Sequence, residues 1–357
     1  MPNRLISDVP QTSVELPTEA VSPTCMPPLY WERKESDMSI NAIQFQHGLS
    51  LAQFQVRYGS EPQCEQALVA ARWPQGFKCA HCGCKRSFTT RNGQGRQLWE
   101  CFLCGYQSSS IVGTVMEHTK LPLTVWFLAM YLITQHKGGI SALALKRYLG
   151  VSYKSAWLVK HKLMQAMAQH DATYRLQGRV EIDDAYLGGE RAGSINGGRK
   201  AANKTAFVAA VQTLPDGRPL YVHLTPVVDF TNQEMHQWAQ QHLAPGCHVV
   251  SDGTPAFAQV CQAQASHERH VTGGGRQGAQ MPQLHWVNTV LGNLKTSLVG
   301  TYHSFNHAKY AARYLAEFAY RFNRRFDLPA MLPRLLKVIA TTAALPLKLI
   351  RLSEARR

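Results

Sequence analysis

Residues 179–190 read RVEIDDAYLGGE, and residues 247–253 read CHVVSDG. In both stretches, apolar residues suited to a buried strand lead to an acid that glycine soon follows, which is typical of a strand running into a turn. Between them, KTAFVAAVQTL and PLYVHLTPVV flank the turn PDGR, and NQEMHQWAQQHLA has the apolar spacing of an amphipathic helix. The sequence therefore predicts three strands, a helix, a fourth strand and then further helices, beginning with TPAFAQVCQAQA.

This order of elements is that of an α/β fold of the ribonuclease-H-like (RNase-H-like) type, in which the first and fourth strands lie side by side. Asp183 and Asp252, at the ends of those strands, would then meet at one edge of the sheet. Carboxylates held together favour a hard cation, and Mg²⁺ is the expected one, with Mn²⁺ able to substitute. Two such ions about 4 Å apart could activate an attacking hydroxyl and stabilise the leaving oxygen of a phosphodiester. The alternative is that each acid is an ordinary turn or cap residue.

Asp184 is the other acid in the first of these stretches. Because side chains alternate across a strand, Glu181, Asp183 and Ala185 share one face, whereas Ile182 and Asp184 point to the other. We therefore assign the metal-binding role to Asp183 rather than to its neighbour.

Enzymes of this architecture normally add a third acid from a later helix, yet residues 269–316 contain none. The helix predicted at 285–305 offers Asn288 instead, 36 positions beyond Asp252. Its amide oxygen can still bind Mg²⁺, and Lys295, two turns along the same helical face, could hold a DNA phosphate. The alternative is that Asn288 is a helix cap or a surface amide.

Glu317, in the next predicted helix, is the rival for the third position. Its neighbours in YLAEFAYRF are mostly apolar and aromatic. It is therefore either a catalytic acid or a buried structural partner of an arginine such as Arg321, one helical turn further on.

Two cysteine pairs, in KCAHCGC and ECFLCGY, are separated by 18 residues. Each pair places two thiolates on one tight turn, and the glycine after each second cysteine allows the backbone to bend. The sequence therefore predicts a structural Zn²⁺ site with four sulfur ligands, Cys79, Cys82, Cys101 and Cys104. The intervening residues are expected to form a hairpin that turns at 92–95. A disulfide framework is the alternative, which the expected lack of an export signal disfavours.

Residues 121–168 have helical spacing throughout. An apolar helix is followed by GGISALALKRYLG and VSYKSAWLVKHKLMQAM, which read as two helices joined by a short turn. This pattern is typical of a helix-turn-helix, whose second helix would enter a DNA major groove led by Tyr153, Lys154 and Ser155. A plain helical linker is the alternative.

The chain of 357 residues carries a formal net charge of +15. From residue 269 onward there are fourteen Lys or Arg against three acids, so the excess is concentrated near the C-terminal end. Nucleic acid is the expected partner, with a merely basic surface as the alternative. The apolar runs are too short or too interrupted to span a bilayer, so we expect no membrane partner and a cytoplasmic, nucleoid-associated location.

Several motifs together resemble one known family. RWPQGFKC, the knuckles CAHCG and CFLCG, VEIDDAYLGGE, VVSDGTPAF, WVNTVLGNLKTSLVGTYHSF and LAEFAYRFNRRF occur in this order between about residues 40 and 330. They are similar to the zinc-ribbon DDE transposases of bacterial insertion sequences, in particular to insertion sequence family fifteen-ninety-five, the ISXO-two-like group. The chain resembles the branch with Asn at the third catalytic position. The resemblance thus assigns catalytic roles to Asp183, Asp252, Asn288 and Lys295.

The resemblance implies a DNA transposase that binds the terminal inverted repeats of its element and catalyses metal-dependent strand cleavage and strand transfer. It also implies double-stranded DNA, at the element ends and at the target, as the partner of a homo-oligomer that holds two ends. Two alternatives are an RNase-H-like nuclease without joining activity and a DNA-binding regulator derived from a transposase.

These signals predict six parts of the chain. They are, in order, a disordered tail at 1–37, a helical segment at 38–74, a zinc ribbon at 75–112, a helix-turn-helix-like segment at 113–172, the RNase-H-like domain at 178–330 and a basic tail at 331–357. Met38 opens the first patterned segment and is a candidate for the true start.

Overall fold

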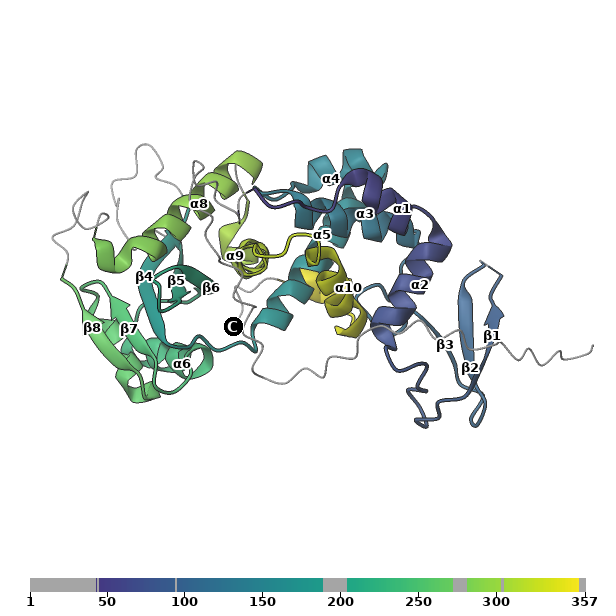
Figure 1. The fold of residues 1–357 in the computed structure, drawn as a ribbon, viewed down its shortest axis with the longest axis horizontal. Helices are drawn as coiled ribbons and strands as arrows, with labels where there is room; N and C mark the ends of the chain where they lie inside the picture. The colour runs from purple at the N-terminus through teal and green to yellow at the C-terminus, as the bar shows by residue number, and fades with distance from the viewer. Residues whose placement is uncertain are drawn as a thin grey trace, which may run out of the picture. The chain divides into compact units, whose positions relative to one another are not determined.

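The fold is that of a computed structural model, which describes residues 43, 45–93, 95–188, 204–271, 281–302 and 305–352 (Figure 1). The expected disordered tail at 1–37 and the candidate start at Met38 lie outside these residues. Most of the buried apolar residues of the described part form three clusters. One lies inside a helical bundle, and the other two lie on the two faces of a β-sheet.

The helical bundle is assembled from separate parts of the chain. Its helices are α1 (Leu51–Tyr58), α2 (Glu61–Arg72), α3 (Leu123–Gln135), α4 (Ala142–Leu149), α5 (Tyr153–Asp171), α10 (Met331–Thr341) and α11 (Leu347–Arg351). The apolar run at 121–134 becomes α3, and its Trp126, Phe127 and Met130 are buried by the surrounding helices. Within the described residues, none of the helices has both the length and the apolar character needed to cross a membrane.

A serine caps the start of each of the helices α4 and α5, and a glycine ends α4 at the turn between them. The Ser141 hydroxyl accepts the backbone N–H of Ala144, and the Ser152 hydroxyl accepts that of Ser155, each at 3.1 Å. Each bond satisfies an N–H that the first helical turn leaves without a partner. Gly150 ends α4 with a φ of 64°, a left-handed conformation that glycine adopts without strain. The two helices and the short turn predicted here are therefore present.

The expectation of a basic tail at 331–357 is wrong for the residues that the structure describes. Residues 331–341 form α10, which packs against α2, α3 and α5. Leu335 and Ile339 on its inner face are fully buried. Pro333 does not prevent this helix because it lies in the first turn, where a backbone N–H has no intrahelical acceptor.

The zinc-ribbon segment folds as a small antiparallel sheet in the order β1-β2-β3. Its strands are β1 (Ser87–Arg91), β2 (Gln97–Cys101) and β3 (Gln107–Ser109). The predicted hairpin is confirmed, with the Asn92 N–H donating to the Arg96 carbonyl at 2.9 Å. The sequence did not predict β3. Arg72 of α2 donates to the carbonyl groups of Ser109 and Ser110, which joins the ribbon to the bundle.

The larger sheet has five strands in the order β6-β5-β4-β7-β8. They are β4 (Arg179–Leu187), β5 (Thr205–Thr213), β6 (Pro219–Pro226), β7 (His248–Ser251) and β8 (Ser266–Arg269). The first three pair antiparallel, whereas β7 runs parallel to β4 and β8 parallel to β7. This topology is RNase-H-like and confirms the predicted fold, including the adjacency of the first and fourth strands.

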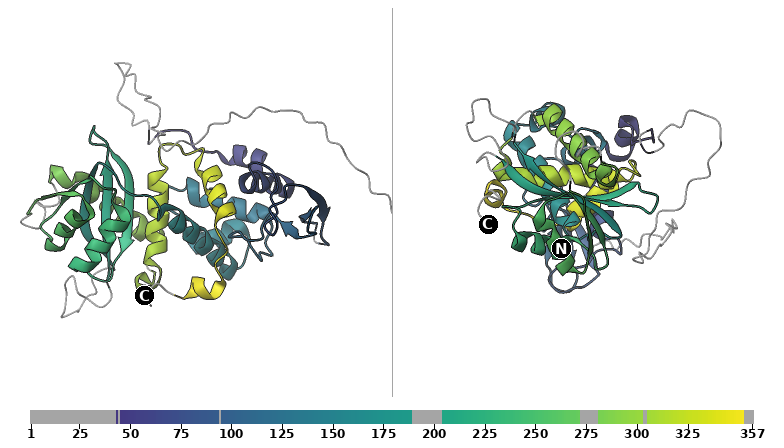
Figure 2. Two further views of the ribbon diagram at one scale, coloured as in Figure 1. Left: turned by 90° about the horizontal axis from the view of Figure 1, so that it is seen from below. Right: turned by 90° about the vertical axis from the view of Figure 1, so that its left-hand side faces the viewer.

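Helices cover both faces of this sheet (Figure 2). The elements on one face are α8 (His285–Tyr302) and α9 (His307–Asn323), and those on the other are α6 (Asn232–His242) and the 3₁₀ helix η1 (Pro255–Ala263). The helix predicted after β7 is thus a 3₁₀ helix, which rises further per residue and lets a short segment return the chain to β8. The sequence did not predict β8, because its residues SHER lack the apolar alternation of a half-buried strand.

Candidate active site

The acids of β4 lie beside the acid that follows β7. Asp183 is in the middle of β4 and not at its end as expected, because this strand continues to Leu187 beside β5. Ser251, the last residue of β7, pairs with Ile182 of β4, so the next residue on each side of this pair is an aspartate, Asp252 and Asp183. Asp183, Asp184 and Asp252 each offer a carboxylate oxygen, and these atoms all lie within 4.8 Å of one another. Carboxylates this close repel one another unless a cation neutralises them, and hard oxygen ligands are those that Mg²⁺ prefers. The three aspartates therefore fit a divalent metal centre.

Asp184 lies in this cluster, although the sequence indicated only its neighbour. Its backbone position is on the expected face, that of Ile182. Because β7 has already ended, the Asp184 carboxylate reaches past the strand end toward Asp252. The Thr254 hydroxyl lies between them, donating to Asp184 Oδ1 at 3.1 Å and lying 3.3 Å from Asp252 Oδ2. The Thr254 N–H also donates to Asp252 Oδ1 at 3.0 Å, as in a turn in which an aspartate binds the backbone two residues further on. The sequence signal for such a turn is the Thr two residues after the acid in SDGT.

Asn288 lies near the start of α8, the helix that packs on the Asp183 face of the sheet. Its Nδ2 donates to the Leu284 carbonyl at 3.0 Å. Because a carbonyl oxygen only accepts hydrogen bonds, this contact requires the amide nitrogen there and turns Oδ1 the other way. Lys295, two turns further along α8, is exposed to solvent. The structure thus brings the three aspartates together, and the roles of Asn288 and Lys295 in the site stay predictions.

Glu317 lies outside this group of acids, as far as the described residues go, and is buried between α5 and α9. Its Oε2 lies 2.9 Å from Lys160 Nζ and accepts the Tyr302 hydroxyl at 2.9 Å. Arg321 Nε lies 3.8 Å from its other oxygen. Burial by itself would raise the pKa of Glu317, but Lys160 and Arg321 outweigh it, so the pKa lies below its usual value. This geometry supports the structural interpretation, with Lys160 as the nearest partner.

The four cysteines predicted as Zn²⁺ ligands converge at one point of the ribbon. Their sulfur atoms all lie within 4.8 Å of one another, with 3.7 Å between Cys79 and Cys104 and 3.4 Å between Cys82 and Cys101. A tetrahedral Zn²⁺ with bonds of about 2.3 Å requires sulfur atoms roughly 3.7 Å apart. In each knuckle the glycine after the second cysteine has a positive φ and donates its N–H to the first cysteine's carbonyl at 3.0 Å. The donor set and its spacing fit Zn²⁺.

The surface around the α4–α5 turn carries aromatic and basic side chains. Tyr148 and Tyr153 are 61% and 50% exposed, and Lys154 is exposed beside them. Lys146 and Arg147 on α4 are exposed as well. This surface suits contact with the DNA backbone, and the assignment of α5 as a recognition helix stays a prediction.

Four of the arginines that make up the basic excess near the C-terminal end form contacts inside the protein. The four residues are Arg313, Arg321, Arg324 and Arg325. In that order, they form hydrogen bonds with Gln165 and Ile350, with the loop after α3, with Asp171 and with β6. The Arg324–Asp171 pair, for example, has an N–O distance of 2.6 Å and largely buried side chains. These four guanidinium groups therefore hold α9 and the residues that follow it against α5, the loop after α3 and the sheet.

The fold and the site define a DDE-type, RNase-H-like domain that follows a four-cysteine zinc ribbon. Residues 175–323 match the family model of the ISXO2-like transposase domain, and residues 59–107 match that of the transposase zinc-ribbon domain. These segments make up more than half of the chain, which belongs to the zinc-ribbon, ISXO2-like transposases of insertion sequences.

A relative from an archaeal mobile element supports this assignment. The chain is 32% identical over 131 residues to an uncharacterized protein in transposable element ISH50 of Halobacterium salinarum. The alignment covers 36% of this chain and 42% of the relative, so it spans less than half of the relative's length.

Proposed function

We propose that this transposase cuts DNA at the ends of its insertion sequence and joins the freed ends to a target. The observation that carries the proposal is the group of three aspartates at the junction of β4 and β7. Cleavage and joining are both in-line phosphoryl transfers, so one site can serve both reactions.

The proposed site has three acids and one amide. Asp183 and Asp252 would hold Mg²⁺, with Asp184 as a third carboxylate and Asn288 as a neutral oxygen ligand. A divalent metal bound there would activate the attacking hydroxyl and stabilise the leaving oxygen. Asp184 supplies the negative charge that an Asn at the third position lacks. Lys295, exposed on the same helix, would bind a phosphate of the DNA next to the site.

The zinc ribbon and the α4–α5 segment would recognise the terminal inverted repeats. The exposed Lys154, Tyr153 and Tyr148 support this role, since basic and hydroxyl-bearing side chains contact phosphates and aromatic ones pack on sugars and bases. A homo-oligomer that holds two ends completes the proposal.

Removal of one cation that binds a phosphate should reduce the slope of log K against log salt by about 0.9. Lys154→Ala and Lys295→Ala should therefore both weaken the salt dependence of DNA binding.

One assay tests the proposed activity against its two alternatives. Purified protein is incubated with Mg²⁺ and a supercoiled plasmid that carries the terminal sequences of the element, and the cut and joined strands are mapped. Breaks at the element ends followed by joined products support a transposase. Breaks without joined products support a nuclease instead, and end binding without breaks supports a regulator.

A further inference from the structure

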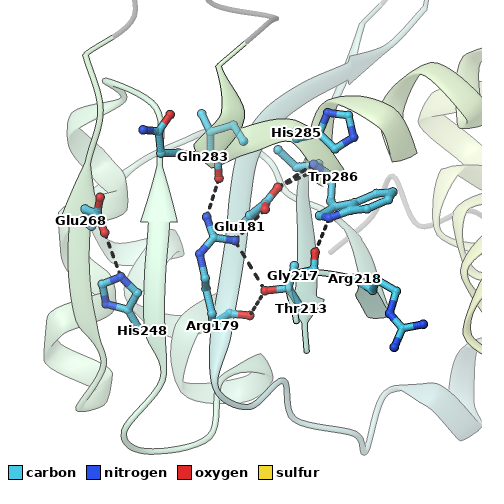
Figure 3. Close-up of polar contacts among 12 residues, drawn as sticks. Arg179, Glu181, Thr213, Gly217, Arg218, His248, Glu268, Gln283, His285 and Trp286 are labelled. Carbon is cyan, nitrogen blue, oxygen red and sulfur yellow. Dashed lines mark hydrogen bonds and ion pairs between the residues drawn. The ribbon is translucent and has the colours of Figure 1, made fainter. Parts of the chain in front are cut away.

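Glu181 is a buried carboxylate that connects β4 to the start of α8. Only 1% of the residue is exposed. Its Oε2 accepts the backbone N–H groups of Trp286 and Val287, at 2.8 and 3.0 Å, and its Oε1 lies 2.7 Å from Arg179 Nη1 (Figure 3). Both oxygens are therefore occupied by contacts within the chain.

Arg179 adds a second connection between the same two elements. Its Nη2 donates to the Gln283 carbonyl at 2.7 Å, just before α8 begins (Figure 3). One guanidinium group thus binds Glu181 on its own strand and the backbone that leads into the helix. The Trp286 indole N–H also donates to the Gly217 carbonyl in the β5–β6 turn, so the start of α8 is held on two sides.

The bond geometry suits a carboxylate in electrostatic as well as steric terms. The amides of Trp286 and Val287 belong to the first turn of α8, whose N–H groups have no acceptor within the helix. The helix dipole places partial positive charge at this end, and a buried anion there is favourable. The Arg179 guanidinium balances the remaining charge of Glu181.

The position of Glu181 relates this contact to the metal centre. Glu181 lies two residues before Asp183 and on the same face of β4, because side chains alternate along a strand. Asn288 directly follows Val287, whose amide Glu181 binds. The carboxylate therefore fixes the distance between the strand that carries the first aspartate and the helical turn that carries the amide.

We infer that Glu181, supported by Arg179, is a positioning residue that sets Asn288 against Asp183 in the metal centre. The inference rests on the proposed function, in which Asn288 Oδ1 serves the divalent metal. Glu181 itself touches neither metal nor DNA and acts through the placement of α8. Asn288 depends on this placement because its amide nitrogen donates to the Leu284 carbonyl, in the segment that leads into the helix. This bond fixes the orientation of the amide relative to α8, so the position of the helix sets the position of Oδ1.

The test compares the variant Glu181→Gln with a matched control. Glutamine keeps the size of the side chain but removes the charge and sets an NH₂ group against Arg179 or the helix amides. Glu234→Gln is the control, because Glu234 also accepts two backbone N–H groups, those of Val228 and Asp229, but on α6 at the other face of the sheet. Changes in partners that orient metal ligands typically weaken metal affinity by about 10–100-fold.

Four quantities are measured on each full-length protein: Mn²⁺ affinity by titration without DNA, the Mg²⁺ concentration at half-maximal end cleavage, affinity for element-end DNA, and Tm. We expect Glu181→Gln to raise the Mn²⁺ Kd and the Mg²⁺ midpoint by about tenfold or more, with DNA affinity unchanged. Glu234→Gln should leave both metal quantities at their wild-type values. A merely structural Glu181 would lower Tm while the folded protein kept wild-type metal quantities, and that result overturns the inference.

Arg179→Lys provides a milder variant if Glu181→Gln does not fold. Lysine keeps a positive charge beside Glu181 but lacks the fork that also reaches the Gln283 carbonyl. It should shift the two metal quantities in the same direction by a smaller factor, and a wild-type result from folded Arg179→Lys overturns the inference. Wild-type protein that binds Mn²⁺ and cuts DNA, with Glu181→Gln indistinguishable from it, overturns the positioning role alone. Wild-type protein that binds no Mn²⁺ overturns the proposed metal centre and the positioning role with it.

Discussion

Lys160 of α5 and Glu317 of α9 form an ion pair with an Nζ–Oε2 distance of 2.9 Å and side chains that are 0% and 2% exposed. Lys160 also donates to the Ile140 carbonyl at 2.7 Å and to the Tyr302 hydroxyl at 2.8 Å. The pair therefore links the proposed recognition helix to the two helices, α8 and α9, that cover the catalytic sheet. Glu317 serves here to hold two parts of the protein together.

Loss of one member of this pair should destabilise the protein strongly. Lys160→Met leaves the Glu317 charge buried without its cation, and breaking a buried pair in this way costs about 3–5 kcal/mol. The free energy of unfolding, from denaturant titration, measures the effect. The double variant Lys160→Met/Glu317→Leu should recover part of the loss, because it removes both charges of the pair, while Arg321 keeps its hydrogen bonds to the His136 and Lys137 carbonyls. A double variant no more stable than the single one contradicts this account.

The same carboxylate should make stability depend on acid pH. The pKa of folded Glu317 lies below its ordinary value of 4.5, so its contribution is complete above pH 4.5 and is lost as pH falls through the folded-state pKa. Unfolding free energies of wild type and Glu317→Gln, compared at pH 7 and at steps below pH 4.5, should therefore converge on acidification. If the difference in unfolding free energy between the two proteins stays constant with pH, the effect of the substitution comes from packing and not from charge.

Zinc content should follow the four cysteines of the ribbon. We expect one Zn²⁺ per chain, and Cys101→Ser should lower this ratio and unfold the segment at about 75–110, since metal binding and folding are one event in small ribbons. Cys84→Ser is the matched control, because Cys84 lies next to the knuckle but outside the four-sulfur group. Metal analysis of reduced protein decides the matter, and an unchanged ratio in Cys101→Ser would show that its thiolate is not a ligand.

DNA cleavage and DNA binding should separate at the acidic cluster. Asp183→Ala and Asp252→Ala should abolish cutting and keep binding to element ends, because they remove metal ligands and lessen the repulsion of phosphate. Asp184→Asn should reduce both cutting and Mn²⁺ affinity if Asp184 is the third carboxylate. Full cutting by Asp184→Asn would limit the metal ligands to the two aspartates predicted from sequence. Binding and cutting are measured on the same folded preparations.

Asn288 should tolerate Asp better than Ala, but only in part. Asn288→Ala removes the oxygen and should lower the cleavage rate strongly. Asn288→Asp keeps an oxygen, yet its second carboxylate oxygen meets the Leu284 carbonyl, where the amide now donates at 3.0 Å. Two acceptors repel, so part of the activity should remain with altered metal preference. Near-normal cutting by Asn288→Ala together with an inactive, folded Glu317→Gln would move the third catalytic position to α9.

The features that depend on local pattern could be predicted from the amino-acid sequence. Cysteine spacing predicted the zinc-ribbon ligands, since two tight knuckles need only neighbouring residues and a glycine. The alternation in RVEIDDAYLGGE and the acid that follows the apolar run in CHVVSDG predicted two adjacent strands that bring their acids together, and β4 and β7 do pair in parallel. Gly150 and the Ser152 cap likewise set the α4–α5 turn through residues close in the chain.

Contacts between residues distant in sequence could be established only from the folded chain. Asp184 enters the acidic cluster because β7 ends at Ser251, a length that strand periodicity does not specify. Glu181 reads as one more acid on a strand until α8 packs over it and two backbone N–H groups of that helix donate to its Oε2. In the sequence Arg324 adds to the basic excess, whereas in the structure Asp171 pairs with its guanidinium group. In each case the partner is supplied by another element, so its effect on charge and position exists only once the chain has folded.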